Sequence, residues 1–202
     1  MQEYFRRDLA FVRHADAVIG PSKECVRDAG IEYFLQKHKL HTTINGIDVQ
    51  KFRPYKADRL KLRDRFPIQN GAPLIFTASR LTREKGIHIL IQAFPKVLKS
   101  VPDAFLLIAG VGPSKNRLKQ QTKDLDLVDK IFFLGHIENT ELAYYYNVCD
   151  LFVYPTLRHE SFGISVAEAM ACGCPVVAAN SGGISTSIDH GINGFLYKPH
   201  KP

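Results

Sequence analysis

The chain has 202 residues, of which 45% are hydrophobic and 23% charged, an ordinary composition for one large globular domain or for one domain and part of another. No apolar run approaches the roughly 18 to 20 residues of a membrane-spanning helix, and the first residues lack the apolar segment of a secretory signal. These features argue against membrane-spanning and secreted proteins, and we expect a soluble cytoplasmic chain. The 27 Lys and Arg exceed the 20 Asp and Glu, giving a formal net charge of +7.

The basic charge is concentrated in the first third of the chain. Residues 1–66 hold 14 Lys and Arg against 9 Asp and Glu. Such an excess favours anionic partners, which include nucleotides, nucleic acid and membrane surfaces, although solvated helix faces explain most charges of this kind. No recognisable nucleic-acid motif accompanies it, so we expect no nucleic-acid partner. Peripheral contact with anionic lipid, at the cytoplasmic face of a membrane, stays open.

The first 72 residues predict helices and strands in alternation. The sequence opens with an amphipathic helical pattern, and Ser22 supplies a cap before a second helix. The strands are expected at residues 17–20 and 40–44, and the helices at 23–38 and 58–66.

From residue 73 onward, apolar strands alternate regularly with helices. The predicted strands are 74–79, 104–109, 131–134, 151–154 and 175–178, and the predicted helices are 86–100, 114–125, 140–148 and 162–172. Near-continuous apolar strands separated by helices are typical of a parallel sheet covered on both faces. The predicted fold class is therefore α/β, a doubly wound parallel sheet. Ligands of such sheets bind beyond the carboxyl ends of the strands.

Cations and glycines follow the first two of these strands. Arg80 and Lys85 lie in the loop after strand 74–79. A guanidinium and an ammonium together balance the charge of a diphosphate, although either alone is more often a solvated surface charge. The next strand runs into a Gly-x-Gly sequence that ends at Gly112. Lys115 stands where the dinucleotide fingerprint has its third glycine, and a tight turn explains the glycine pair equally well.

Two carboxylates are the most informative residues. Glu160 lies in the loop after strand 151–154, and Glu168 lies inside an apolar helix that starts near Phe162 or Gly163. Burying an unpaired carboxylate costs several kcal/mol or forces it to take up a proton, so Glu168 requires an internal partner or a ligand with hydroxyl groups. Both carboxylates can face one pocket, where amides at the helix start would cradle phosphate or sugar oxygens. A surface Glu160 with an internally paired core Glu168 is the alternative.

Three other patterns are weaker. Asp124 and Asp126 match a short motif of metal-dependent sugar transferases, but they lie in a polar stretch away from the ligand edge, and we interpret them as solvated. His159 could donate a proton, yet no partner is visible in the sequence, and we interpret it as a loop histidine. Cys172 and Cys174 are explained by packing better than by half a metal site. We expect reduced thiols and no metal.

Six short motifs stand in a fixed order along the chain. They are Asn45-Gly-Ile-Asp48, Ser79-Arg-Leu81 with Lys85-Gly86, Ala109-Gly-Val-Gly-Pro113, Glu160-Ser-Phe-Gly163, Glu168-Ala-Met-Ala-Cys-Gly173, and Ser181-Gly-Gly183 through Gly191 to Gly194. Each is common by itself, but the ordered set, over residues 15–198, resembles the family 4 retaining glycosyltransferases of the GT-B fold. In that family two Rossmann-like domains face each other across a cleft, and the C-terminal one binds the sugar donor.

The resemblance implies a reaction and a set of roles. A hexose-type sugar would pass from a nucleotide-diphosphate sugar to an acceptor with retention of anomeric configuration and without a metal or other cofactor. Arg80 and Lys85 would hold the diphosphate, and Glu168 would accept hydrogen bonds from the ribose. Glu160 would be the catalytic residue and contact the transferred sugar. The implied donor-binding residues are Arg80, Lys85, Gly112, Ser161, Phe162, Gly163, Ile164 and Glu168. The acceptor, whether a glycan, a lipid-linked sugar or a small molecule, is not named by the motifs.

The resemblance also divides the chain. Residues 1–44 would be the last helix and strand of an N-terminal acceptor-side domain, residues 45–72 a linker, and residues 73–202 the donor-binding domain, shortened at its C-terminal end. We therefore expect the isolated chain to bind donor but to turn over poorly or not at all. Ser185 and Thr186 replace the Pro-Glu usual at that point of the family, so any acidic role there is absent.

Two other functions fit the same motifs. A non-catalytic nucleotide-sugar binding module, or an inactive fragment, would use the same loops without reaction. A nucleotide-sugar epimerase of the same fold would release nucleotide without transferring sugar to an acceptor.

Overall fold

The computed structural model describes residues 11, 12, 14–57, 61, 65–69 and 71–199. The helices predicted at the start of the chain and at residues 58–66 lie largely outside this part.

Six parallel strands form the central sheet, in the order β5-β4-β3-β6-β7-β8. Their bounds are β3 Leu74–Ala78, β4 Phe105–Ala109, β5 Ile131–Gly135, β6 Leu151–Tyr154, β7 Val176–Ala179 and β8 Phe195–Tyr197. From β3 the chain moves outward through β4 to β5, then returns to place β6 on the other side of β3. The strand order therefore reverses between β3 and β6.

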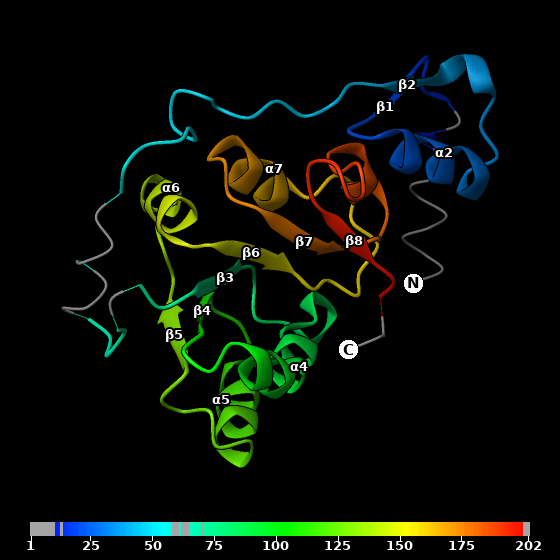
Figure 1. Cartoon of the computed structure of the whole chain (residues 1–202). Coiled ribbons are helices and arrows are strands. Elements are labelled where there is room, and N and C mark those ends of the chain that lie inside the picture. The colour runs from blue at the N-terminus through cyan, green and yellow to red at the C-terminus, as the bar shows by residue number, and fades with distance from the viewer. Residues whose placement is uncertain (1–10, 13, 58–60, 62–64, 70, 200–202) are drawn as a thin grey trace.

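Helices cover both faces of this sheet (Figure 1). Helices α4 (Ile87–Ser100) and α5 (Lys115–Asp124) pack on one face, and α6 (Asn139–Val148) and α7 (Ile164–Ala171) pack on the other. Alternate side chains of each strand feed two separate cores, because successive side chains of a strand point to opposite faces. The predicted doubly wound parallel sheet is confirmed.

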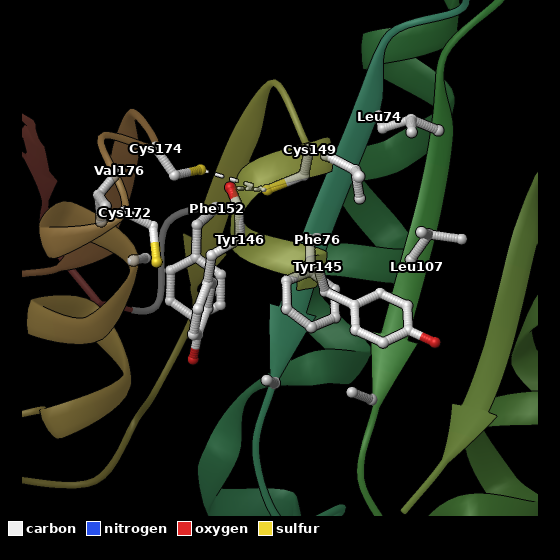
Figure 2. Close-up of a cluster of buried hydrophobic side chains, with 14 of the residues drawn as sticks. Leu74, Phe76, Leu107, Tyr145, Tyr146, Cys149, Phe152, Cys172, Cys174 and Val176 are labelled. Atoms are coloured by element: carbon white, nitrogen blue, oxygen red, sulfur yellow. Dashed lines mark hydrogen bonds between the residues drawn. The ribbon is translucent and has the colours of Figure 1, made fainter. Parts of the chain in front are cut away.

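Aromatic side chains fill the core under α6 and α7 (Figure 2). Phe76 of β3 is fully buried and stacks on Tyr145 with ring centroids 5.4 Å apart. Tyr146 and Phe152 meet the same ring at 5.6 and 5.9 Å. Such aromatic pairs add roughly 0.5 to 1.5 kcal/mol each beyond the area they bury. This core fixes α6 against β3 and β6, the two strands on either side of the reversal.

Cysteines complete the same core. Cys149 and Cys174 are buried with their Sγ atoms 3.2 Å apart, and Cys172 is buried beside them. All four cysteines are free thiols. The prediction that Cys172 and Cys174 serve packing is confirmed. Within the described ranges no group of three or more His, Cys, Asp or Glu side chains is arranged to hold a metal ion.

The N-terminal lobe comprises two parallel strands, β1 (Val18–Gly20) and β2 (Leu40–Thr42), joined by α2 (Lys23–Glu32) (Figure 1). Ser22 caps α2 as predicted, its Oγ accepting from the Cys25 amide at 3.0 Å. The predicted extension of this helix to residue 38 is wrong. Phe34 adopts a left-handed backbone at φ 54°, and the Leu35 amide donates to the Gly30 carbonyl, which closes the helix end. A residue other than glycine seldom adopts that conformation, so the apolar periodicity gave no sign that the helix ends there.

No helix among the described residues is long and apolar enough to cross a membrane.

Candidate functional site

A pocket of about 210 Å³ opens at the carboxyl edge of the sheet, next to the strand reversal. It is lined by Ala78, Ser79, Arg80, Ala109, Gly110, Val111, His136, Ile137, Leu142 and Ser165. These residues come from the ends of β3, β4 and β5 and from the starts of α6 and α7. The pocket therefore lies where doubly wound sheets bind their ligands.

An ion pair joins the two loops at the reversal. The Lys85 Nζ lies 2.5 Å from Glu160 Oε1, and their side chains are only 10% and 14% exposed. Thr156 Oγ1 donates to the same carboxylate oxygen at 2.9 Å. Lys85 also donates to the Tyr154 hydroxyl at 3.2 Å. Burial, and then the charge of Glu160, raise the pKa of Tyr154. Four polar groups from β3–α4 and β6–α7 thus form one cluster.

Close backbone contact holds these two loops together. Gly86, at the end of the Lys85 loop, has φ 70°, and a methyl group there would overlap the carbonyl oxygen of Pro155. The amides of Leu157 and Arg158 both donate to the Glu84 carbonyl, at 2.8 and 3.1 Å. Only glycine combines the left-handed backbone with so close an approach.

The loop after β7 clamps Glu160 from the other side. The Gly183 amide donates to the Glu160 carbonyl at 2.7 Å, and Ser181 Oγ donates to the Arg158 carbonyl at 2.8 Å. Gly182 has φ 61°, and a side chain there would overlap the Glu160 carbonyl oxygen. The backbone of the Glu160 loop is therefore fixed on both flanks, and its side chain is held separately by Lys85 and Thr156.

Glu168 has a different environment. Its residue is 6% exposed, and its Oε2 accepts from the Tyr146 hydroxyl at 3.1 Å. Burial raises the pKa of Glu168, while the Tyr146 hydrogen bond, the charge of Lys51 and a hydrogen bond with Asn139 act in the opposite direction. The internal partner that the sequence required is Tyr146. Burial, and then the Glu168 charge, hold the pKa of Tyr146 well above its ordinary value.

A short network connects Glu168 to the pocket. Ser165 lines the pocket and hydrogen-bonds with Tyr146, which in turn donates to Glu168. Because Ser165 precedes Glu168 by about one helical turn, both side chains lie on the same face of α7. Ser165 and Tyr146 thereby link the pocket to the buried carboxylate, which is not itself among the residues that line the pocket.

The remaining predicted donor-binding residues are distributed around this site. Arg80 lines the pocket directly. Gly112 lies where any side chain would overlap the backbone of Leu81, so its packing role is evident. Gly163 is the N-cap of α7 and offers no side-chain oxygen to its amides, and the predicted helix start is confirmed. Ser161 and Ile164 are exposed, whereas Phe162 is buried and has only its backbone to offer a ligand.

The two weaker candidates have clear positions. Asp124 ends α5, and Asp126 follows it in a left-handed conformation, at the opposite edge of the sheet from the pocket. Gln120 donates to Asp124 at an exposed position. His159 has a partner that sequence did not reveal, since its Nε2 lies 3.0 Å from Asp28 Oδ2 of α2. The N-terminal lobe thus touches the loop that carries Glu160.

Among the site residues that sequence reasoning missed are Tyr146, Tyr154, Thr156 and Ser165. The two tyrosines lie within apolar runs and look like core residues. The available signal was chemical, since a buried Tyr hydroxyl nearly always has a hydrogen-bond partner.

Comparison with known proteins gives a consistent family. The family of glycosyl transferases group 1 matches residues 58–202. Alpha-monoglucosyldiacylglycerol synthase of Streptococcus pneumoniae is 36% identical over 190 residues, covering 93% of this chain and 42% of that protein. A GDP-mannose-dependent alpha-(1-6)-phosphatidylinositol monomannoside mannosyltransferase of Mycobacterium tuberculosis is 33% identical, covering 75% of this chain and 40% of that protein. The chain spans less than half the length of these two relatives.

Solved structures of known proteins have the same fold as this chain. Anabaena Alr3699/HepE in complex with UDP and glucose superposes with a TM-score of 0.87 at 29% identity, covering all of this chain and 55% of that one. Sucrose-phosphate synthase from Thermosynechococcus elongatus gives 0.84 at 26% identity, covering all of this chain and 50% of that one. This chain belongs to the group 1 glycosyl transferases, and its sheet is the Rossmann-like C-terminal half of the GT-B fold.

Proposed function

We propose that the chain is the donor-binding part of a retaining glycosyltransferase that moves a hexose-type sugar from a nucleotide-diphosphate sugar to an acceptor. The observation that carries the proposal is the Lys85–Glu160 pair, which joins the loop after β3, where Arg80 lines the pocket, to the loop after β6. In this proposal Lys85 is the cation for the leaving diphosphate and Glu160 the anion for the sugar, and their ion pair supports the assignment.

The cations serve the leaving group. Breaking the anomeric bond builds negative charge on the departing diphosphate, and fixed cations and helix amides stabilise that charge without reorganisation. Arg80 lines the pocket, Lys85 follows it in the same loop and is paired with Glu160, and the uncapped start of α7 presents amides at the same edge of the sheet. These groups supply the positive charge that a divalent ion supplies in other transferases, so the proposed reaction uses no metal.

Glu160 serves the sugar. Positive charge develops on the anomeric carbon, and a carboxylate that is already ionised stabilises it. Lys85 and Thr156 both hold Oε1 of Glu160, which makes the carboxylate a poorer nucleophile. We therefore assign Glu160 to positioning and charge stabilisation, and retention to attack of the acceptor on the face from which the diphosphate leaves.

Glu168 serves the nucleotide. Tyr146 occupies one lone pair of its Oε2, and the carboxylate retains acceptor capacity for the two ribose hydroxyls. A ligand that donates hydrogen bonds to Glu168 would offset the cost of its burial.

The names of two relatives suggest a class of acceptor. One is a synthase of alpha-monoglucosyldiacylglycerol, and the other is a phosphatidylinositol monomannoside mannosyltransferase, so both names refer to lipids. A lipid-linked acceptor, reached at the cytoplasmic face of a membrane, is therefore the first class to test. Because the chain spans about half of such proteins, we propose that it binds donor by itself and transfers sugar slowly.

Calorimetric titration with UDP, GDP, ADP and their hexose conjugates tests this function. We expect one nucleotide to bind selectively and Arg80→Gln to weaken it about tenfold or more, as loss of a charged hydrogen bond does. Arg117→Gln, an exposed site on α5, is the matched control and should bind as the wild type. A folded protein that binds none of these ligands, or that loses affinity equally in the control, contradicts the proposal. Release of nucleotide with an epimerised sugar and no transfer would instead indicate an epimerase.

A further inference from the structure

The side-chain hydroxyl of Thr156 is buried between a backbone amide and the carboxylate of Glu160. Its residue is 0% exposed. Its Oγ1 accepts from the Arg158 amide at 3.2 Å and donates to Glu160 Oε1 at 2.9 Å. Two backbone carbonyls, of Glu84 and Arg158, lie farther away, at 3.4 and 3.5 Å. The single hydroxyl proton is therefore best placed on the carboxylate.

Lys85 shares this carboxylate but has competing partners. Its Nζ lies 2.5 Å from Glu160 Oε1 and 3.2 Å from the Tyr154 hydroxyl, and 5.6 Å from the centre of the Tyr154 ring. A diphosphate beside Arg80 would attract the same ammonium, because it carries about two negative charges. Any movement of Lys85 toward that ligand weakens its hold on Glu160.

Thr156 has no such competition. It is a neutral hydroxyl held by the Arg158 amide, and the loop that carries it is fixed by Gly86 on one side and by Gly182 and Gly183 on the other. Its hydrogen bond to Glu160 does not depend on the position of the Lys85 ammonium. Lys85 and Thr156 both use Oε1, so neither occupies Oε2, and Tyr154 is a further hydrogen-bond partner of the carboxylate.

We propose that Thr156 is a positioning residue, which keeps the Glu160 carboxylate in place for the transferred sugar when the Lys85 ammonium turns to the donor diphosphate. The proposal rests on the donor-binding function above. It separates two parts of the ligand, because Thr156 acts on the sugar through Glu160 and reaches the diphosphate only indirectly, through the carboxylate that it shares with Lys85.

The test compares Thr156→Val, which keeps the shape and removes the hydroxyl, with Thr156→Ser, which keeps the hydroxyl. Thr122→Val is the matched control, since Thr122 is a buried threonine in α5 that donates to the Leu118 carbonyl. Calorimetry measures the affinity of each variant for UDP, or for GDP or ADP if the wild type selects it, and for the matching hexose conjugate. Donor hydrolysis is measured in parallel.

We expect Thr156→Val to bind the nucleoside diphosphate within about twofold of the wild type and its hexose conjugate about tenfold more weakly. Donor hydrolysis should fall by a similar or larger factor, and Thr156→Ser should restore both. Equal loss for nucleotide and conjugate, no loss for either, or failure of Ser to restore binding overturns the positioning role. A wild type that binds no nucleotide overturns the donor function itself. A wild type that binds the conjugate no differently from Thr156→Val overturns only the inference about Thr156.

Discussion

The two carboxylates at the sheet edge are held by opposite means. Glu160 is paired with a cation and receives a hydroxyl hydrogen bond on the same oxygen. Glu168 is more deeply placed in apolar surroundings and receives a hydrogen bond from a neutral phenol, and burial raises its pKa. A direct ion pair compensates the first, whereas Tyr146, the charge of Lys51 and Asn139 only partly compensate the burial of the second. The comparison teaches that one residue type can be held at a sheet edge by an ion pair or buried at a net cost, which under the proposed function the donor would relieve.

Removal of the cation should produce the largest effect. Lys85→Met leaves the nearly buried Glu160 charge without its partner, and we expect a loss of about 3 to 5 kcal/mol in the free energy of unfolding, measured with urea at pH 7.5. The double variant Lys85→Met with Glu160→Gln should recover most of that loss, because no unpaired charge remains.

The exposed pair between Arg158 and Glu84 provides the control for this experiment. Its atoms are 3.4 Å apart, and the side chains are 52% and 45% exposed. Arg158→Met should cost at most about 1 kcal/mol. If Lys85→Met lowers the free energy of unfolding no more than Arg158→Met does, Lys85 does not compensate a buried charge on Glu160.

Removal of the phenol should produce an intermediate effect. Tyr146→Phe preserves the ring packing against Phe76 and Phe152 but takes away the hydrogen bond to Glu168, and we expect a loss of about 1 to 3 kcal/mol. The loss should be larger at pH 8 than at pH 4, where Glu168 takes up a proton more easily. A loss that does not change with pH would mean that the phenol serves packing rather than the carboxylate.

Neutralising Glu168 should produce the smallest effect on stability, and the change should stabilise the fold, whereas the preceding variants destabilise it. The pKa of Glu168 is raised in the folded chain above its ordinary value of 4.5, so the folded state holds the proton more tightly than the unfolded state. The free energy of unfolding therefore falls as pH rises from 4.5 through the raised pKa of the folded chain. Glu168→Gln removes this penalty and retains an acceptor for Tyr146. Its melting temperature should exceed that of the wild type at pH 8, and the difference should vanish below pH 4.5.

The same variant sharpens the functional half of the comparison. If Glu168 binds the ribose hydroxyls, Glu168→Gln should bind the nucleotide several-fold more weakly while melting at a higher temperature. Unchanged affinity with raised stability would show that Glu168 is a core residue only.

The central sheet was predictable because its strands are continuous apolar runs in the sequence. Residues 74–79 and 104–109 could be assigned to a buried parallel sheet, and the observed β3 and β4 match those assignments within a residue at each end. Glu168 could be singled out for the same reason, since a carboxylate contradicts its apolar neighbours. The end of α2 could not, because it depends on a left-handed Phe34.

The pairing of side chains across the fold was harder to predict than the positions of the helices and strands. Lys85 and Glu160 are 75 residues apart and Tyr146 and Glu168 are 22 apart, and each pair meets only through the packing of different strands and helices. Thr156 gave no sign in the sequence, because a threonine after a strand is ordinary there. A pattern of residue types places groups at a sheet edge, whereas pairing depends on rotamers and loop contacts that periodicity does not encode.

The strand reversal has a consequence for how the molecule folds. β3 and β6 lie side by side, yet α4, β4, α5, β5 and α6 all intervene along the chain. Contacts of such long sequence separation form slowly, because chain closure must precede them. The Lys85 and Glu160 loops are therefore apart in any intermediate that has built only β3, β4 and β5. Nucleotide bound at this edge would select the fully assembled sheet, and its rate of binding during refolding would report when the last strands have docked.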